Sequence, residues 1–388
     1  MNKKSLYIGV MSGTSLDGVD TVLVDFKNGI TSDIEVLCSY SVEMPLDIKQ
    51  MILSMCQGQS ITLQTLGTLD HRLGLLYSDA INALIAKSGV AREDVIAVGC
   101  HGQTVWHQPS GEHRFSMQIG DCNLIAERTN ITVVGDFRRR DMACGGQGAP
   151  LVPIFHQYLF ASKSSLENIA VLNVGGISNI TVLPAGCNDG EAGSLLIRGY
   201  DTGPGNILMD SWISKCKGEA YDKDGRFAES GTTSTELLDT FLSNEFFSRQ
   251  PPKSTGRELF NIEWLNNQLD CLTKQRNGNK ISNQDVQATL LDLTVESISR
   301  EIEKIGCQKL IVCGGGAKNL YFMKKLSGRL PQVKVAKSIE YGVDGDLIEC
   351  LAFAYLAECT INGKPSNVPS VSGASKPSIL GAIYMKQK

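Results

Sequence analysis

Two segments in different halves of the chain share one pattern, in which a short apolar strand, a polar turn containing glycine and a second apolar strand follow one another. The first consists of strands 6–11 and 19–26 around turn 12–18, and the second is the run AVLNVGGISNITVL at 170–183. Each pattern predicts a β-hairpin rather than a strand that leads into a helix. A hairpin that occurs twice indicates two halves of similar topology, and a chain of 388 residues is long enough to form two domains.

The segments between and after these hairpins alternate between helical and strand patterns, which predicts an α/β fold. We expect helical segments at 47–87, 206–215, 285–305, 320–330 and 346–359, and apolar strands at 94–99, 131–134 and 309–313. The glycine-rich loop 144–150 indicates a domain boundary nearby. We therefore predict an N-terminal lobe formed by residues 1–135 with about 368–388, and a C-terminal lobe formed by residues 136–367.

Composition and charge argue against several classes of protein. The net charge of −4 gives no electrostatic reason to bind a polyanion, so nucleic acid is not an expected partner. The twelve cysteines are scattered singly, without a CxxC pair or a zinc-type spacing, which favours a reducing cytoplasm over a disulfide framework or a structural metal. The first apolar stretch is too short for a signal peptide, and no apolar run approaches the roughly 20 residues of a membrane helix. We expect a soluble cytoplasmic protein that does not bind membranes.

The turn of the first hairpin, SGTSLDGVD at 12–20, combines hydroxyls, carboxylates and glycines. Such a turn can direct N–H groups and hydroxyls at phosphate oxygens, while Asp17 or Asp20 binds hydrated magnesium. An ordinary tight hairpin with Asx and Ser turns explains these residues equally well. The second turn, 173–179, repeats the arrangement, and two turns that grip the phosphates from both sides favour a nucleotide site. The sequence contains neither GxxxxGK[ST] nor a GxGxxG that opens a helix, so it indicates neither a P-loop nor a Rossmann site.

Two further glycine loops precede predicted helices in the second half. The run 314–316 consists of three glycines, where the backbone can approach an adenosine closely; close packing between strand and helix is the alternative. The loop GYDTGPGN at 199–206 holds one carboxylate, Asp201. A kinase needs one positioned base and neutralisation of charge around the phosphoryl group, and Asp201 can be that base. The alternative is that Asp201 only caps the following helix.

Polar groups at strand ends in the first half suit a polyhydroxylated ligand that carries a carboxylate. They are His101, Gln103, Thr104, Gln118, Asp136 and Arg138. The guanidinium of Arg138 can pair with the acid through two hydrogen bonds. Taken singly, such groups are usually satisfied loop residues, and His101 in particular can be a buried structural histidine.

A series of motifs follows from residue 8 to the final ILGAIY: IGVMSGTSLDGVD, GCHGQT, GDFRRRDMACGGQGAPLVP, LNVGGISN, GYDTGPGNILMD, PKSTGRE, DVQATL and VCGGGAKN. Together they resemble the anhydro-N-acetylmuramic acid kinase family. The resemblance is specific because several unrelated loops agree in order across the whole chain. It implies a two-domain actin-like fold, a duplicated ribonuclease-H-like α/β topology, with ATP and Mg²⁺ in an interdomain cleft.

The resemblance also implies a reaction, in which ATP, water and 1,6-anhydro-N-acetylmuramic acid give N-acetylmuramic acid 6-phosphate and ADP during recycling of the bacterial cell wall. The sugar O6 is part of the anhydro bridge and has no proton to remove, so the base must act on water. We predict that Asp201 deprotonates a water that attacks the anomeric carbon, while the released O6 attacks the γ-phosphate in line.

The same motifs assign roles to further residues. We expect nucleotide contacts from Gly13, Thr14, Ser15, Leu16, Asp17, Gly18, Val19, Asp20, Asn173, Gly175, Gly176, Gly203, Gly205, Asn206, Gly314, Gly315, Gly316 and Asn319. We expect substrate contacts from His101, Gln103, Thr104, Gln118, Asp136, Arg138 and Glu349. Asp17 and Asp20 are the predicted magnesium ligands, each through water.

Two other functions remain open from the residues alone. A kinase of the same fold that acts on a free sugar hydroxyl predicts activity on glucose-like or glycerol-like acceptors. An actin-like ATPase with a protein partner predicts ATP hydrolysis without an acceptor, and it leaves His101, Gln103 and Arg138 unexplained. The sequence does not determine the oligomeric state, and a homodimer is our working expectation.

Overall fold

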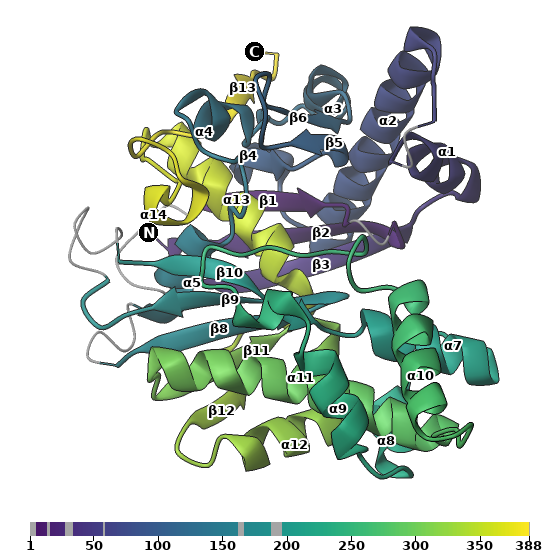
Figure 1. Ribbon diagram of the computed structural model, residues 1–388. Coiled ribbons are helices and arrows are strands. Elements are labelled where there is room, and N and C mark those ends of the chain that lie inside the picture. Colours follow the sequence, from purple (N-terminus) through teal and green to yellow (C-terminus); the bar gives the residue numbers. More distant parts are fainter. Residues whose placement is uncertain are drawn as a thin grey trace. The chain divides into compact units, whose positions relative to one another are not determined.

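A computed structural model describes residues 5–13, 16–27, 34–56, 59–161, 167–187 and 196–387. The chain forms two compact units (Figure 1). Unit 1 consists of Met1–Lys163 and Leu347–Lys388, and unit 2 consists of Ser164–Asp346. Within the described residues, no helix is both long enough and apolar enough to cross a membrane.

The sheet of unit 1 has the strand order β13-β7-β4-β1-β2-β3. Strand β2 runs antiparallel to both β1 and β3, β4 is parallel to β1, and β7 is parallel to β4. Strand β13 closes the edge antiparallel to β7, and a separate hairpin is formed by β5 and β6. The strands are β1 (Leu6–Met11), β2 (Gly18–Asp25), β3 (Glu35–Glu43), β4 (Val95–Cys100), β5 (Gln103–Gln108), β6 (Phe115–Ile119), β7 (Val133–Gly135) and β13 (Ala382–Tyr384).

Helices cover the sheet of unit 1. They are α1 (Leu46–Cys56), α2 (Leu63–Ser88), α3 (Cys122–Thr129), α4 (Arg139–Ala143), α5 (Pro153–Phe160), α13 (Ile348–Ile361) and α14 (Pro369–Ser372), with a 3₁₀ turn η2 (Arg92–Asp94). The helical segment predicted at 47–87 is therefore two helices. Helix α2 begins at Thr62, whose side chain accepts a hydrogen bond from the Thr65 N–H, and ends at Gly89 with φ of 66°. Glycine adopts this left-handed conformation without the steric cost that a Cβ atom imposes.

Helix α13 belongs to unit 1, whereas the sequence-based boundaries assigned residues 136–367 to the other lobe. It packs directly on β1 and β4, because both strands carry a glycine at the contact. A Cβ atom at Gly9 would overlap the carbonyl oxygen of Cys350, and one at Gly99 would overlap the carbonyl oxygen of Phe353. This close approach places the helix in the first unit, and residues 136–163 also belong there.

The sheet of unit 2 repeats the arrangement of unit 1, with the order β10-β9-β8-β11-β12. Strands β8, β9 and β10 are antiparallel, β11 is parallel to β8, and β12 is parallel to β11. The strands are β8 (Ile169–Val174), β9 (Ile177–Leu183), β10 (Arg198–Pro204), β11 (Lys309–Cys313) and β12 (Lys334–Lys337). Strands β1, β2, β3, β4 and β7 of unit 1 have the same order and directions. The α/β fold class with a duplicated topology is therefore confirmed.

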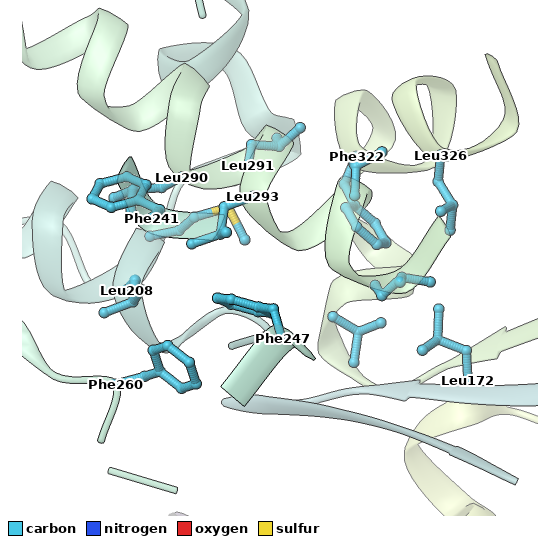
Figure 2. Packing of buried hydrophobic residues seen from close by; sticks show 14 of the residues in the cluster. Leu172, Leu208, Phe241, Phe247, Phe260, Leu290, Leu291, Leu293, Phe322 and Leu326 are labelled. Carbon is cyan, nitrogen blue, oxygen red and sulfur yellow. The ribbon is translucent and has the colours of Figure 1, made fainter. Parts of the chain in front are cut away.

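Helix α11 is central to unit 2, where it contacts α7, α8, α9, α12 and β10. The helices are α7 (Ile207–Lys217), α8 (Arg226–Glu229), α9 (Thr235–Leu242), α10 (Ile262–Gln275), α11 (Asn283–Ile305) and α12 (Leu320–Arg329), with 3₁₀ turns η4 (Lys223–Gly225), η5 (Glu245–Ser248), η6 (Gly315–Lys318), η7 (Ser338–Tyr341) and η8 (Gly345–Leu347). Figure 2 shows part of the core, to which Phe247, Phe260 and leucines of α11 all contribute. Each buried side chain of this size contributes roughly 1.5–3 kcal/mol.

Candidate functional site

The predicted glycine turns of unit 2 meet beside the ends of strands β8, β10 and β11. A Cβ atom at Gly314 would overlap the side-chain oxygen of Asn173, and one at Gly205 would overlap the carbonyl oxygen of Gly175. Glycine is required where backbones approach this closely. The structure therefore gathers most of the predicted nucleotide residues of this unit: Asn173, Gly175, Gly176, Gly205, Asn206, Gly314, Gly315 and Gly316.

The 173–179 turn also holds the start of helix α7. The Gly175 oxygen accepts a hydrogen bond from the Asn206 N–H at 2.8 Å, and the Gly176 oxygen accepts from Gly205 at 2.9 Å and from Ile207 at 3.1 Å. These carbonyls satisfy N–H groups that a helix start leaves without an intrahelical partner. The turn thus has a structural role that sequence reasoning did not assign to it.

Gly203 and Asn319 have structural contacts of their own. Gly203 is buried with φ of 150°, and a Cβ atom there would lie 2.9 Å from the ring of Phe247. Asn319 caps α12, since its side-chain oxygen accepts a hydrogen bond from the Phe322 N–H at 3.0 Å. These contacts account for both residues without a ligand.

Asp201 lies inside strand β10, not in a loop before a helix, where it pairs with Asn179 of β9. Its N–H donates to the Lys253 oxygen at 3.0 Å, and its carboxylate Oδ2 accepts from the Thr255 N–H at 2.9 Å. Asn206, not Asp201, occupies the cap position of α7. The alternative prediction, that Asp201 caps this helix, is therefore wrong.

The electrostatic surroundings of Asp201 suit a base that works near neutral pH. Burial raises the pKa of Asp201 from its ordinary value of 3.8 to about 6; the Thr255 N–H lowers this pKa and the charge of Glu258 raises it. A carboxylate with this pKa is mostly ionised at pH 7, yet it takes up a proton more readily than an ordinary aspartate. Such a pKa is what general base catalysis requires.

The glycine turn of unit 1 presents its backbone, because two of its side chains belong to the core. Leu16 and Val19 are buried in the hydrophobic cluster of this unit, so any contact they make with a nucleotide is through the main chain. The Leu16 N–H donates to the Gly13 oxygen at 3.2 Å, and Gly18 lies against the backbone of Val42. The predicted residues Thr14 and Ser15 lie outside the described residues.

The two predicted magnesium ligands have different surroundings. Asp17 is exposed and forms an ion pair with Lys49 at 3.2 Å. Asp20 accepts a hydrogen bond from the Ser41 hydroxyl at 2.6 Å. The pKa of Glu349 is raised, first by desolvation and further by the charge of Asp20, although Arg138 opposes the shift. The charge of Asp20 therefore acts on Glu349, and the ammonium of Lys49 lies beside Asp17.

A polar cluster in unit 1 connects His101 with Arg138. The Arg138 Nε and Nη2 lie 3.1 and 2.8 Å from His101 Nε2, and Nη1 donates to the Gly148 oxygen at 2.7 Å. Burial, and then the Arg138 charge, holds the pKa of His101 well below its usual range. Burial also lowers the pKa of Arg138 to about 10, against the influence of Glu349. His101 is thus neutral and its Nε2 accepts from the guanidinium.

Other predicted substrate residues lie beside this cluster. Gln103 accepts a hydrogen bond from the Ser12 hydroxyl at 2.8 Å, and Thr104 accepts one from the Gln118 amide at 3.1 Å. A cavity of about 510 Å³ in unit 1 is lined by His101, Gln118 and Asp136 among other residues. Its lining is rich in carboxylate, hydroxyl and amide groups: Asp70, Ser116, Gln118, Asp121, Asn123 and Asp136. This surface suits hydroxyl and amide groups of a ligand.

Sequence reasoning missed the residues that surround Asp201. Lys253 and Thr255 lie in PKSTGRE, a motif to which no role was assigned, and both bind Asp201 through the backbone. Glu301 lies between Ile298 and Ile302 on the buried face of α11. A carboxylate within an apolar stripe was the signal available in the sequence.

Comparisons with known proteins agree with the motifs. The sequence profile of the anhydro-N-acetylmuramic acid kinase family matches residues 5–386. The anhydro-N-acetylmuramic acid kinase of Pasteurella multocida is 50% identical over 386 residues, which cover 98% of this chain and 97% of the relative. That of Vibrio cholerae is 49% identical and covers 99% of both chains. Among solved structures, the activator of 2-hydroxyisocaproyl-CoA dehydratase from Clostridium difficile with bound ADPNP matches with a TM-score of 0.44 at 12% identity, covering 92% of this chain and 97% of that one.

Proposed function

The chain belongs to the anhydro-N-acetylmuramic acid kinase family and is an ATP-dependent kinase, and we propose that Asp201 is its catalytic base. The enzyme opens 1,6-anhydro-N-acetylmuramic acid with water and phosphorylates O6, which yields N-acetylmuramic acid 6-phosphate for cell-wall recycling. The observation that supports the base is the Asp201 carboxylate, fixed by the Thr255 N–H and held with a pKa of about 6.

The anhydro bridge determines what the base must do. Since O6 carries no proton, Asp201 takes the proton of a water whose oxygen forms the new bond to the anomeric carbon. The bond between that carbon and O6 breaks, and O6 forms a bond to the γ-phosphorus while ADP leaves. Positioning and charge neutralisation supply most of the acceleration of a phosphoryl transfer.

We assign sugar binding to the polar cluster of unit 1. Arg138 supplies a guanidinium for the lactyl carboxylate of the substrate. Neutral His101 accepts hydrogen bonds from that guanidinium and so fixes its orientation. Gln103, Thr104, Gln118 and Asp136 are assigned to the hydroxyl and amide groups of the sugar. The hydrogen bonds that already fix these side chains support the assignment, because preordered groups lose less entropy on binding.

We assign nucleotide binding to the glycine turns, through the main chain. The close approach of Gly205 to Gly175 and of Gly314 to Asn173 supports the assignment, because it brings the glycine turns of unit 2 together at one place. Asp17 and Asp20 are the proposed ligands of a hydrated magnesium ion, each through water, and Glu349 adds a carboxylate whose charge interacts with that of Asp20. When bound, the ion neutralises charge on the phosphates.

A cytoplasmic location is part of this proposal, supported by the requirement for ATP and by cysteines that are scattered singly along the sequence. The homodimer stays a prediction, because the contacts described here are those of a single chain.

Replacement of Asp201 by Asn tests the base. We expect phosphorylation of the anhydro sugar to fall by at least about a hundredfold, which is the usual contribution of a general base. Nucleotide affinity, measured by calorimetry, is expected to stay within about twofold, because the amide retains an acceptor for the Thr255 N–H. A variant that turns over at nearly the normal rate would remove Asp201 from this role.

A further inference from the structure

Glu301 is a buried carboxylate in unit 2 with three partners. It lies on helix α11, which packs against the sheet of this unit (Figure 1). Its Oε1 accepts from Lys253 Nζ at 3.0 Å and from Lys304 Nζ at 2.9 Å, and its Oε2 accepts from the Tyr200 hydroxyl at 3.2 Å. The side chains of Lys253 and Glu301 are only 2% and 3% exposed, whereas that of Lys304 is 51% exposed.

A buried ion pair of this kind is poor evidence for stability. Removing two charges from water is costly, and well-packed apolar residues in their place often leave a protein equally stable. The pair therefore requires a reason other than folding energy, and its location suggests one.

Both buried partners of Glu301 flank Asp201. Tyr200 directly precedes Asp201 in β10. Lys253 provides the carbonyl that accepts the Asp201 N–H, and Thr255, two residues further on, donates its N–H to the Asp201 carboxylate. Residues 253–256 lie in neither a helix nor a strand, so side-chain anchors have to hold this segment in place. The Lys253 ammonium, which also lies 5.0 Å from the centre of the Phe246 ring, is such an anchor.

We propose that Glu301 is a positioning residue for Asp201, which it holds from both sides through the Tyr200 hydroxyl and the Lys253 ammonium. This inference rests on the proposed role of Asp201 as the base. Glu301 contacts no reacting atom and acts only through these two residues.

Losing this anchor is expected to change the pKa of Asp201. Desolvation and the charge of Glu258 raise this pKa, whereas the Thr255 N–H stabilises the charged form and lowers it. If segment 253–256 moves, all three contributions change together, so the pKa of Asp201 departs from its wild-type value. The carboxylate of the base is also less well aligned.

The experiment compares steady-state kinetics of the full-length enzyme with ATP and anhydro sugar across pH 5–9. The test variants are Glu301→Gln and the double variant Lys253→Met with Glu301→Met. The single variant leaves the buried ammonium of Lys253 without its partner charge and can unfold for that reason. The double variant removes both charges and is therefore expected to keep its fold. The matched control is Lys274→Met, which removes an exposed ammonium of α10 in the same unit.

We expect kcat to fall about tenfold to a hundredfold in the folded test variants, the cost of a small misplacement of a catalytic group. The KM values for both substrates should stay within about twofold, and the acid limb of the kcat profile should move away from its wild-type position. The control should match the wild type. A purely structural role would change the unfolding midpoint without moving the acid limb.

Two results overturn the inference and are distinguishable. If Asp201→Asn is inactive while the folded double variant keeps the wild-type kcat and pH profile, Glu301 does not position the base, and the proposed function stands. If Asp201→Asn is itself fully active, the proposed base and its positioning residue fail together.

Discussion

Asp201→Asn is expected to stabilise the protein at neutral pH while it abolishes catalysis. The pKa of Asp201 is raised from 3.8 to about 6, so the folded state disfavours the carboxylate. A difference of this size corresponds to about 3 kcal/mol when the group is fully ionised. Asp201 retains some solvent contact, which reduces the cost to about 1–2 kcal/mol. The amide carries no charge and still accepts from the Thr255 N–H.

The pH dependence fixes the sign of this effect. Below the ordinary pKa of 3.8, the carboxyl is protonated in both folded and unfolded states, so it costs nothing. The cost appears as the pH rises and is complete above a pH of about 6. The stability gained by Asp201→Asn should therefore be present at pH 7.5 and largely absent near pH 4.

Urea unfolding followed by tryptophan fluorescence measures this difference. Trp212 and Trp264 lie in unit 2, as Asp201 does, so the signal reports chiefly on the relevant unit. Asp239→Asn is the matched control, since it removes an exposed carboxylate of α9 in the same unit and should change the unfolding free energy by less than about 0.5 kcal/mol. A variant that is no more stable than the wild type at pH 7.5, or one whose gain persists at pH 4, would refute the reasoning.

Two further predictions concern unit 1. Gly99→Ala should lower the free energy of unfolding by about 3 kcal/mol or more, because the new methyl group overlaps the Phe353 oxygen of α13. Gly67→Ala, in an open part of α2, should be neutral or slightly stabilising in the same denaturation assay. Arg138→Met should raise the KM for the anhydro sugar about tenfold to a hundredfold and leave the KM for ATP unchanged, because a charged hydrogen bond to the acid of the sugar is lost. Arg140→Met, at an exposed position, is the control. Equal changes in both KM values would contradict the assignment.

Local patterns predicted the features that depend on neighbours in the sequence. The two hairpins, β1 with β2 and β8 with β9, follow from apolar runs on either side of a glycine turn. Helix α2 (Leu63–Ser88) ends within one residue of the predicted helical segment 47–87. Candidate residues at the ends of β8, β10 and β11 meet because these strands belong to one sheet, so a loop after each strand reaches the same region.

The features that the sequence did not predict depend on contacts between residues that lie far apart in the chain. Helix α13 follows unit 2 in the chain, but it packs on Gly9 and Gly99, which lie hundreds of residues earlier. Nothing within residues 346–359 identifies those partners, so the lobe boundary was drawn differently. The strand β3 was not predicted, since its alternating residues are half-buried at best. Asp201 was predicted as a loop residue because the glycine and proline that follow it are typical of loops.

Two carboxylates of unit 2, Asp201 and Glu301, have pKa values that their neighbours shift in opposite directions. Burial and the negative charge of Glu258 raise the pKa of Asp201, and the single Thr255 N–H that lowers it does not offset them. Burial acts in the same direction on Glu301, but Lys304 and Lys253 outweigh it and lower the pKa of that group. A carboxylate between two ammonium groups does not take up a proton near neutral pH, so it can serve as a fixed anchor. A carboxylate without a cation can exchange a proton there, and the separation of the two pKa values assigns the base to Asp201 and the anchor to Glu301.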